Sequence, residues 1–236
     1  MKYEKYKKDL DYSYALGITL TFELLINKSQ YLQDVYFHST FNGEAKEKME
    51  KILKSLGKEP IISDKIFNIL ASKENVYVIG IFKKFTLKLQ NNNHLVLVNP
   101  ANAGNLGTIM RTSLGFGIKD IAIIKPCVDV FDPKTIRASM GAVFNINFEL
   151  YDSFEDYKQQ YNNHHLYPFM LKAKTKLHQT TFSKPFSLIF GNEATGLPDN
   201  FLNYHSVIIA HSKEIDSLNI TNAVSIAIYE ATKNIY

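Results

Sequence analysis

The stretch Ser187-Leu-Ile-Phe-Gly-Asn-Glu-Ala-Thr-Gly-Leu-Pro198 joins an apolar run to a polar segment that is bounded by two glycines. The run at 187–190 lacks polar alternation, which is typical of a strand buried on both faces of a parallel sheet. Gly191 and Gly196 have the spacing of a phosphate-binding loop, but Leu197 and Pro198 stand where that loop requires Lys and Ser or Thr. A P-loop is therefore excluded, and by itself the segment is also consistent with an acidic turn.

Similar apolar runs recur on both sides of this stretch and alternate with helical patterns. The runs lie at 95–98, 121–124, 166–171 and 206–210, and the helical patterns lie at 104–114, 133–143, 154–161 and 217–235. Strands separated by helices predict an α/β fold with a parallel sheet covered on both faces. Ligands of such sheets bind beyond the carboxyl ends of the strands. The polar segments at 99–107, 191–196 and 211–219 follow strands and are therefore candidate binding loops.

The first part of the chain has a less regular pattern, which predicts a small α/β domain. We expect helices at 13–26 and 43–56, a short helix after Ser63, and strands at 32–38 and 75–82. The Asn-rich segment from Lys88 to His94 lacks periodicity and is typical of a linker. We therefore predict two domains, 1–92 and 93–236.

The composition excludes several classes of protein. Hydrophobic residues make up 45% of the 236 residues and charged residues 21%, so wholesale disorder is excluded. The single cysteine allows neither an internal disulfide nor a zinc site that needs two thiolates. No apolar run has the length of a membrane span, and the polar N-terminus does not fit a secretory signal, so we expect a cytoplasmic protein.

The charge is unevenly distributed along the chain. The formal net charge is +4, and residues 1–92 carry all of it, because residues 93–236 hold 12 basic and 12 acidic side chains. A lysine excess favours non-specific attraction to phosphate groups. Only two of the 27 basic residues are arginines, Arg111 and Arg137. Arginine offers a planar donor fork that lysine lacks, so these two positions are candidates for recognition of phosphate or carboxylate oxygens.

Three segments resemble, in this order, the motifs of one enzyme family. They are Asn99-Pro-Ala-Asn-Ala-Gly-Asn-Leu-Gly107 with Arg111 behind it, Gly191-Asn-Glu-Ala-Thr-Gly-Leu197, and Ser217-Leu-Asn-Ile-Thr-Asn-Ala223. Each has an ordinary structural explanation as a turn or a helix cap. Together they resemble the SpoU (TrmH) family of RNA ribose 2′-O-methyltransferases, over residues 94–236. Residues 137–144 also resemble a helical segment of that family.

The resemblance implies a fold and partners. It implies the SPOUT class, a parallel sheet with a trefoil knot near the C-terminus, and a homodimer packed through the knot region. It also implies S-adenosylmethionine as the cofactor and no requirement for a metal. Residues 1–92 are similar only in general character to the small RNA-binding domain of many members. One departure is Ala210, which stands where the family usually has proline after the position of Ile209.

The resemblance also assigns the residues of the site. It places catalytic or site-shaping roles at Asn105, Arg111, Glu193, Ser217 and Asn219, and cofactor contacts at Gly191, Asn192, Ile209, Leu218 and Asn219. Arg111 matches the arginine beside the attacking hydroxyl. Because a guanidinium stays charged in proteins, we favour a phosphate clamp or stabilisation of a developing alkoxide over general-base catalysis.

The expected function is therefore transfer of a methyl group from S-adenosylmethionine to a ribose 2′-hydroxyl of RNA. We expect ribosomal RNA, with 23S rRNA as the leading candidate, rather than transfer RNA. Two alternatives stay open: a non-catalytic RNA-binding or ribosome-assembly module on the same fold, and an RNA base methyltransferase. If the substrate is RNA, we expect the first domain to bind it through its lysines, and its aromatic side chains could stack on unpaired bases. These are Tyr3, Tyr6, Tyr12, Tyr14, Tyr31, Tyr36 and Phe37.

Overall fold

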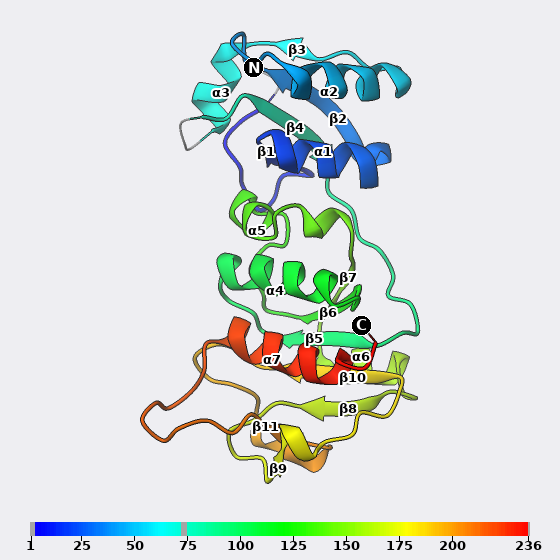
Figure 1. Cartoon of the computed structure of the whole chain (residues 1–236), viewed down its shortest axis with the longest axis vertical. Coiled ribbons are helices and arrows are strands. Elements are labelled where there is room, and N and C mark those ends of the chain that lie inside the picture. The colour runs from blue at the N-terminus through cyan, green and yellow to red at the C-terminus, as the bar shows by residue number, and fades with distance from the viewer. Residues whose placement is uncertain (1–2, 72–74, 236) are drawn as a thin grey trace. The chain divides into compact units, whose positions relative to one another are not determined.

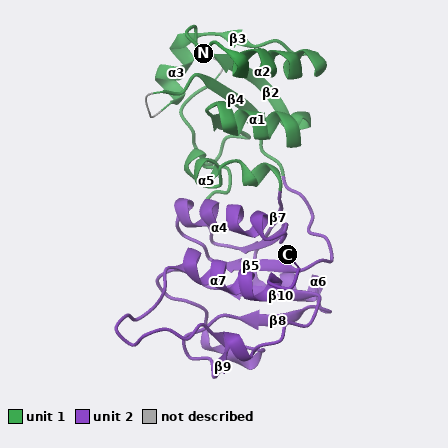
Figure 2. Cartoon of the chain, viewed as in Figure 1, with its two compact units in different colours: residues 1–85, 129–145 green, residues 86–128, 146–236 purple. Residues whose placement is uncertain are grey.

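The computed structural model describes residues 3–71 and 75–235, which form two compact units (Figure 2). The first unit comprises residues 1–85 and 129–145, and the second comprises residues 86–128 and 146–236. Residues 129–145 thus pack with the first unit although the sequence places them in the second predicted domain. One reason is that the Ser13 hydroxyl donates a hydrogen bond of 2.5 Å to the carbonyl oxygen of Phe131. The division at residues 92 and 93 stays a prediction.

The first unit contains a four-stranded mixed sheet in the order β1-β4-β2-β3 (Figure 1). β4 pairs antiparallel with β1 and β2, and β3 pairs parallel with β2. The elements are β1 (Tyr12–Leu16), α1 (Ile18–Asn27), η1 (Ser29–Tyr31), β2 (Leu32–Phe37), α2 (Glu44–Ser55), β3 (Ile61–Ile62), α3 (Asp64–Leu70), β4 (Val78–Lys83), α5 (Pro133–Ala138) and η2 (Ala142–Phe144).

The helix predicted over 13–26 is wrong in its first turn. Residues 13–16 belong to β1, and Gly17, with φ of 112°, separates that strand from α1. The apolar residues at helical spacing therefore included β1, an edge strand of this sheet whose residues 13–15 are buried. The other helices and strands predicted in this part are confirmed within a few residues.

Most of the aromatic side chains proposed for base stacking in this unit are not available. Tyr3, Tyr14, Tyr36 and Phe37 are buried in the core, with Phe37 fully inaccessible. The Tyr31 ring is half-buried and stacks on Phe85 at a centroid distance of 4.6 Å. Burial of these rings stabilises the unit, and it rules out contact of the four buried side chains with an RNA base on the folded protein.

The second unit confirms the predicted α/β fold with a parallel sheet. Its five strands have the order β7-β6-β5-β10-β8, and every pair is parallel. The elements are β5 (His94–Val98), α4 (Ala103–Gly115), β6 (Asp120–Ile124), β7 (Asn147–Tyr151), α6 (Phe154–Gln160), β8 (His165–Pro168), β9 (Thr175–Lys176), η3 (Leu177–Gln179), β10 (Phe186–Phe190), η4 (Asp199–Asn203), β11 (Val207–Ile208) and α7 (Ile220–Thr232).

Two strands of this unit differ from the sequence prediction. The apolar run at 206–210 forms β11, which pairs with β9 in a separate two-stranded sheet rather than in the main sheet. The fifth strand of the main sheet is β7, which the sequence analysis missed because Asn147 and Glu149 interrupt its apolar residues. A strand at the edge of a sheet tolerates such polar residues because one side is not covered by another strand.

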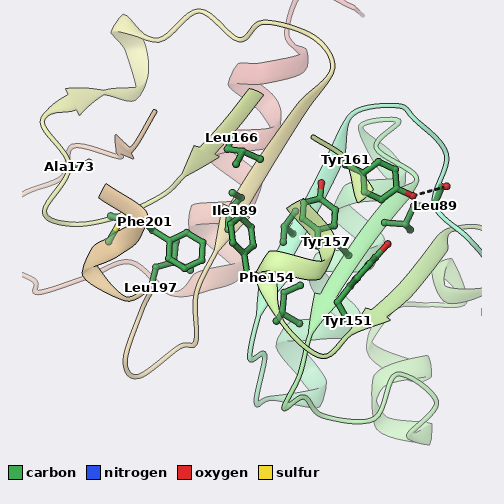
Figure 3. Close-up of a cluster of buried hydrophobic side chains, with 14 residues drawn as sticks. Leu89, Tyr151, Phe154, Tyr157, Tyr161, Leu166, Ala173, Ile189, Leu197 and Phe201 are labelled. Carbon is green, nitrogen blue, oxygen red and sulfur yellow. Dashed lines mark hydrogen bonds between the residues drawn. The ribbon is translucent and has the colours of Figure 1, made fainter. Parts of the chain in front are cut away.

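An aromatic cluster packs α6 and η4 onto the sheet (Figure 3). Phe154, Tyr157 and Tyr161 of the α6 region meet Ile189 of β10 and Phe201 of η4 in this cluster. The rings of Phe154 and Phe201 lie 4.6 Å apart, and the Tyr161 hydroxyl donates to the carbonyl oxygen of Leu89 at 3.0 Å. The cluster fixes the segments that follow β10, where the polar loop at 191–196 begins.

A buried polar layer covers the amino ends of the same strands. The Tyr157 hydroxyl lies 2.9 Å from Nδ1 of His94 and 2.6 Å from the hydroxyl of Ser187. That serine also lies 2.9 Å from Nδ1 of His164. The rings of His94 and His164 are 4.3 Å apart. Burial lowers the pKa of both imidazoles, and for His164, where the charge of His94 adds to the effect, it falls to about 4.

The predicted linker at 88–94 is bound to this layer. The backbone of Gln90 donates to Asp120 at 2.9 Å and its carbonyl oxygen lies 2.6 Å from Nε2 of His94. The Asn91 amide oxygen lies 3.1 Å from Nε2 of His164, and the Asn93 amide oxygen accepts from the Phe186 amide. The polar residues of this segment are therefore hydrogen-bonded parts of the second unit.

Candidate functional site at the carboxyl ends of the strands

A cavity of about 330 Å³ lies beyond the carboxyl ends of β8 and β10. Its walls come from the residues after these two strands, from the residues around the end of β11, and from the start of α7. This is the edge at which a parallel sheet binds its ligands. Predicted site residues that line the cavity are Gly191, Asn192, Glu193, Ile209, Ser217 and Leu218.

The loop after β10 closes on itself at its two glycines. A Cβ atom on Gly191 would lie 2.2 Å from the carbonyl carbon of Gly196 and 2.5 Å from the nitrogen of Leu197. Gly196 has φ of 67°, which a residue with a side chain rarely adopts. The backbone of Gly191 therefore lies directly against that of Gly196 and Leu197, and main-chain atoms form the cavity wall here.

Asn192 holds the inside of the loop and ties it to the neighbouring strand. Its amide oxygen accepts hydrogen bonds from the backbone nitrogens of Ala194 at 2.9 Å and Thr195 at 3.2 Å. Its amide nitrogen donates to the carbonyl oxygen of Asn99, at the end of β5, at 2.9 Å. Asn99 has φ of 54°, in the left-handed region that asparagine tolerates best among residues with side chains. This bond connects the second motif to the first.

Glu193 makes the second connection, at the amino end of α4. Its carboxylate accepts from the backbone nitrogens of Ala101 at 3.1 Å and Asn102 at 3.3 Å, and from the side-chain amide of Asn105 at 3.1 Å. Burial acts to raise the pKa of this carboxyl, but these bonds and one from its own backbone outweigh burial, so the pKa is lowered. Glu193 is thus a carboxylate at neutral pH, held against the electropositive end of a helix.

Arg111 lies on α4, about 9 Å further along the helix axis than Asn105. Its side chain is exposed and has no hydrogen bond or ion pair with the described part of the chain. Glu193 does not bind Arg111 in this structure, because its carboxylate binds the amino end of α4 instead. Arg111 thus leaves its donor fork available to a ligand.

The third motif forms the opposite wall. Ser217 and Leu218 line the cavity, whereas Asn219 does not. Asn219 is the N-cap of α7: its amide oxygen accepts from the backbone nitrogen of Thr221 at 2.8 Å and from its hydroxyl at 2.7 Å. Ile209 lines the cavity, while Ala210, which replaces the usual proline, is exposed.

Two features of the site are absent from the sequence predictions. Asn102 caps α4 by accepting from the backbone nitrogen of Asn105 at 3.0 Å, a role that its place before the helix could have suggested. At the rim of the cavity, Lys172 donates to both carboxylate oxygens of Asp199, at 2.7 and 2.8 Å. These two residues are 27 positions apart, and no local pattern links them.

Among residues 3–71 and 75–235, no group of three or more His, Cys, Asp and Glu side chains is arranged to hold a metal ion. No helix in that part of the chain is long and apolar enough to cross a membrane.

The geometry and the motifs agree with one family. The profile of the SpoU rRNA Methylase family matches residues 92–229, which is more than half of the chain. The chain therefore belongs to the SpoU family, as the three ordered motifs predict.

Individual relatives show how far the similarity extends. A Synechocystis protein named as an uncharacterized tRNA/rRNA methyltransferase is 32% identical over 143 residues, 59% of this chain and 52% of that protein, so the match spans about half of its length. A putative tRNA (cytidine(34)-2′-O)-methyltransferase of Listeria innocua is 28% identical over 148 residues, 60% of this chain and 87% of its own. The crystal structure of an AdoMet-bound rRNA methyltransferase from Sinorhizobium meliloti has the same fold, with a TM-score of 0.81, 24% identity, and coverage of 96% and 88% of the two chains.

Proposed function

We propose that this chain transfers a methyl group from S-adenosylmethionine to a ribose 2′-hydroxyl of RNA. The observation that carries the proposal is the cavity of about 330 Å³ in a SpoU-family chain, lined by the second and third motifs, with the first motif hydrogen-bonded to the second. Its volume suits a small molecule. The ribose as acceptor is supported by the Listeria relative, whose name specifies 2′-O-methylation.

The residues of the cavity fit the proposed cofactor. Phe169, Met170 and Leu218 offer apolar surface for a purine ring, while the main-chain wall at Gly191 offers polar groups without side chains. S-adenosylmethionine, when bound, supplies an electrophilic methyl group on a sulfonium. We propose that Gly191, Asn192, Ile209 and Leu218 hold it, and that Asn105 lies beside it.

The chain's own residues would orient the acceptor. A ribose hydroxyl is a poor nucleophile, so alignment of its oxygen supplies much of the rate. We propose that the Arg111 guanidinium holds a neighbouring phosphate or stabilises negative charge on the attacking oxygen. Glu193 is a poor candidate for the proton acceptor, because its carboxylate already accepts three hydrogen bonds from residues 101–105 and the bonds lower its pKa. We assign it the positioning of α4.

The RNA class, the knot, the location and the oligomeric state are further proposals that follow from membership of the family. We propose ribosomal RNA, with 23S rRNA first, although the names of the relatives include both RNA classes. We also propose a trefoil knot through the loops at 191, 209 and 218, an RNA-binding role for residues 1–92, and a cytoplasmic location. A homodimer through α7 is supported by Ile226 and Tyr229, which are 41% and 57% exposed on a helix whose other face is buried.

The test combines calorimetry with S-adenosylmethionine and methyl transfer to total RNA from cells that lack the gene. Arg111→Lys should lower transfer at least about tenfold while cofactor binding stays unchanged, because lysine lacks the planar fork. Arg137→Lys, in the other unit, is the matched control and should harm transfer less. Nuclease-resistant dinucleotides in the digested product would identify ribose methylation.

The outcomes separate the alternatives. If the protein binds RNA but neither binds the cofactor nor transfers a methyl group to any unmodified RNA, it is a non-catalytic module. If transfer occurs without nuclease-resistant dinucleotides, the acceptor is a base. In either case the proposal of ribose methylation fails.

A further inference from the structure

A second hollow of the second unit lies outside the proposed methyl-donor cavity. It is a groove of about 870 Å³ between the edge strand β8, the segment from Lys172 to Ser183, and the residues that lead into β11. Lys172 lines both the groove and the cavity. The groove therefore starts at the rim of the site and extends along the outer edge of the sheet.

The lining of the groove is basic. Lys172 and Lys174 supply its cationic side chains, His165 and His205 add two imidazoles, and the described lining contains no Asp or Glu. The sequence behind it shows the same bias, because residues 157–192 contain five lysines and no acidic residue. The second part of the chain has no net charge as a whole, so this segment concentrates its positive charge in one place.

The lysines differ in how they are used. Lys172 is neutralised by Asp199, at 2.7 Å. Lys158 donates to the hydroxyl of Tyr204, which lines the groove, at 3.1 Å. Lys174 has neither a hydrogen bond nor an ion pair with any residue that the structure describes, and its side chain is exposed. Lys174 is therefore the cation most available to a ligand in the groove.

The rest of the lining includes several hydroxyl groups. Five Ser and Thr residues contribute to the groove. The Tyr167 hydroxyl accepts from the backbone nitrogen of Ser183 at 2.9 Å and donates to the carbonyl oxygen of Thr181 at 3.3 Å, which fixes this wall on β8. The exposed ring of His205 lies against Tyr167, with 5.8 Å between centroids. Cations, hydroxyls and an exposed ring are the groups that bind a single-stranded nucleic acid.

We propose that this groove binds the phosphodiester backbone of single-stranded RNA, with Lys174 on a phosphate and His205 against a base. The inference rests on the proposed function in so far as RNA is the substrate. It adds an RNA contact surface on the second unit, independent of residues 1–92.

The test measures binding of the full chain to fluorescent single-stranded oligouridine, without cofactor, across a range of salt concentrations. Each phosphate contact on a single strand contributes about 0.7 to the slope of log K against log salt. Lys174→Ala should reduce the slope by that amount, which corresponds to about fivefold weaker binding at 0.1 M salt. His205→Ala should weaken binding a few-fold with an unchanged slope, since a stacked ring makes no ionic contact.

Lys119→Ala is the matched control, because Lys119 is an exposed lysine of the same unit that lies just before β6, at the opposite end of the sheet. Its affinity and slope should equal those of the unaltered chain. Crosslinking with 4-thiouridine RNA should label residues 172–206. Equal effects of Lys174→Ala and Lys119→Ala, or crosslinks confined to residues 1–92, would overturn the proposal. Calorimetry with S-adenosylmethionine on Lys174→Ala separates the two claims: a chain that binds RNA here but no cofactor contradicts the proposed function alone.

Discussion

The two ends of the five-stranded parallel sheet carry similar polar side chains in very different environments. At the amino ends, His94, His164 and Ser187 are buried and hydrogen-bonded to one another through Tyr157. At the carboxyl ends, Glu193 and Ser217 are exposed at the edge of a cavity. The three side chains at the amino ends are thus enclosed in the protein, whereas Glu193 and Ser217 line a cavity of about 330 Å³.

The ionisation states follow from this difference. Burial lowers the pKa of the two imidazoles, which keeps them neutral, whereas hydrogen-bond donors lower the pKa of the Glu193 carboxyl and keep it charged. A buried neutral network stabilises the fold. An exposed carboxylate held by backbone donors positions a helix and a loop without closing the site. The comparison teaches that polar residues at the end of a strand do not identify a site unless their burial is known.

The largest expected effect comes from adding a side chain at Gly191, where the backbone of residues 196 and 197 leaves no space for a Cβ atom. Gly191→Ala puts a Cβ 2.2 Å from the carbonyl carbon of Gly196, so the loop must open. Strained backbone of this kind costs at least about 3 kcal/mol, so affinity for S-adenosylmethionine should fall roughly 150-fold in calorimetry. Gly115→Ala is the control, because nothing lies within 4 Å of its added Cβ and it should bind normally. Unchanged binding by Gly191→Ala would mean that this loop is not the cofactor wall.

The second expected effect is a loss of stability at low pH, when the buried imidazole at the amino ends of the strands is protonated. The folded pKa of His164 is about 4, below the ordinary 6.5, so the unfolded chain binds more protons between these values. The stability from the neutral imidazole is therefore complete above pH 6.5 and is lost as the pH falls towards 4. The loss is up to about 3 kcal/mol in the free energy of urea unfolding.

The variant His164→Gln should unfold with a flatter dependence on pH between 6.5 and 4. His178→Gln is the control, because His178 is exposed and should leave the dependence unchanged. A pH profile that His164→Gln does not alter would show that this imidazole is not the group that titrates.

The same comparison explains what the sequence could and could not predict. Buried parallel strands are uniformly apolar, so the runs that became β5, β6, β8 and β10 were recognisable, and three motifs after such strands placed the candidate site. The segment at 88–94 was predicted as a linker because amide side chains are typical of loops. Its partners, among them Asp120 and His164, are distant in sequence, so no local pattern shows that they bind it.

Helix boundaries and edge strands were predictable only in part. Apolar residues recur through both β1 and α1 with no polar segment between the two elements, and Gly17 marks the change. β7 is at the sheet edge, where polar residues interrupt the pattern. The roles of Glu193 and Asn219 within the site depend on which backbone nitrogen each contacts, which is a property of the folded loops.

A smaller effect tests whether the negative charge of Glu193, at the carboxyl ends of the strands, stabilises the fold. Glu193→Gln removes the charge and one of the two accepting oxygens that bind residues 101–105. Charge-assisted hydrogen bonds contribute about 1.5 to 3 kcal/mol when buried, and this side chain is exposed, so we expect about 1 to 2 kcal/mol less unfolding free energy. The unaltered carboxylate stabilises above its unfolded pKa of about 4.3 and less as pH falls, so the variant should also lose part of the acid sensitivity.

Glu155→Gln, an exposed glutamate on α6, is the control and should change the unfolding free energy by less than about 0.5 kcal/mol. Equal stability of the two variants would show that Glu193 does not hold α4. Its part in the site would then have to be contact with a ligand.

The smallest expected effect distinguishes two roles of Asn219, as the N-cap of α7 and as a residue that methyl transfer needs. Asn219→Ala removes the N-cap of α7 and should cost about 1 kcal/mol of unfolding free energy, as Asn102→Ala should at α4. Asn219→Asp keeps an oxygen that accepts from Thr221, so it should restore stability. If methyl transfer returns with stability, Asn219 is a cap and its predicted catalytic role is wrong. If stability returns and transfer does not, the amide nitrogen, which forms no hydrogen bond with the described residues, is the group that the reaction needs.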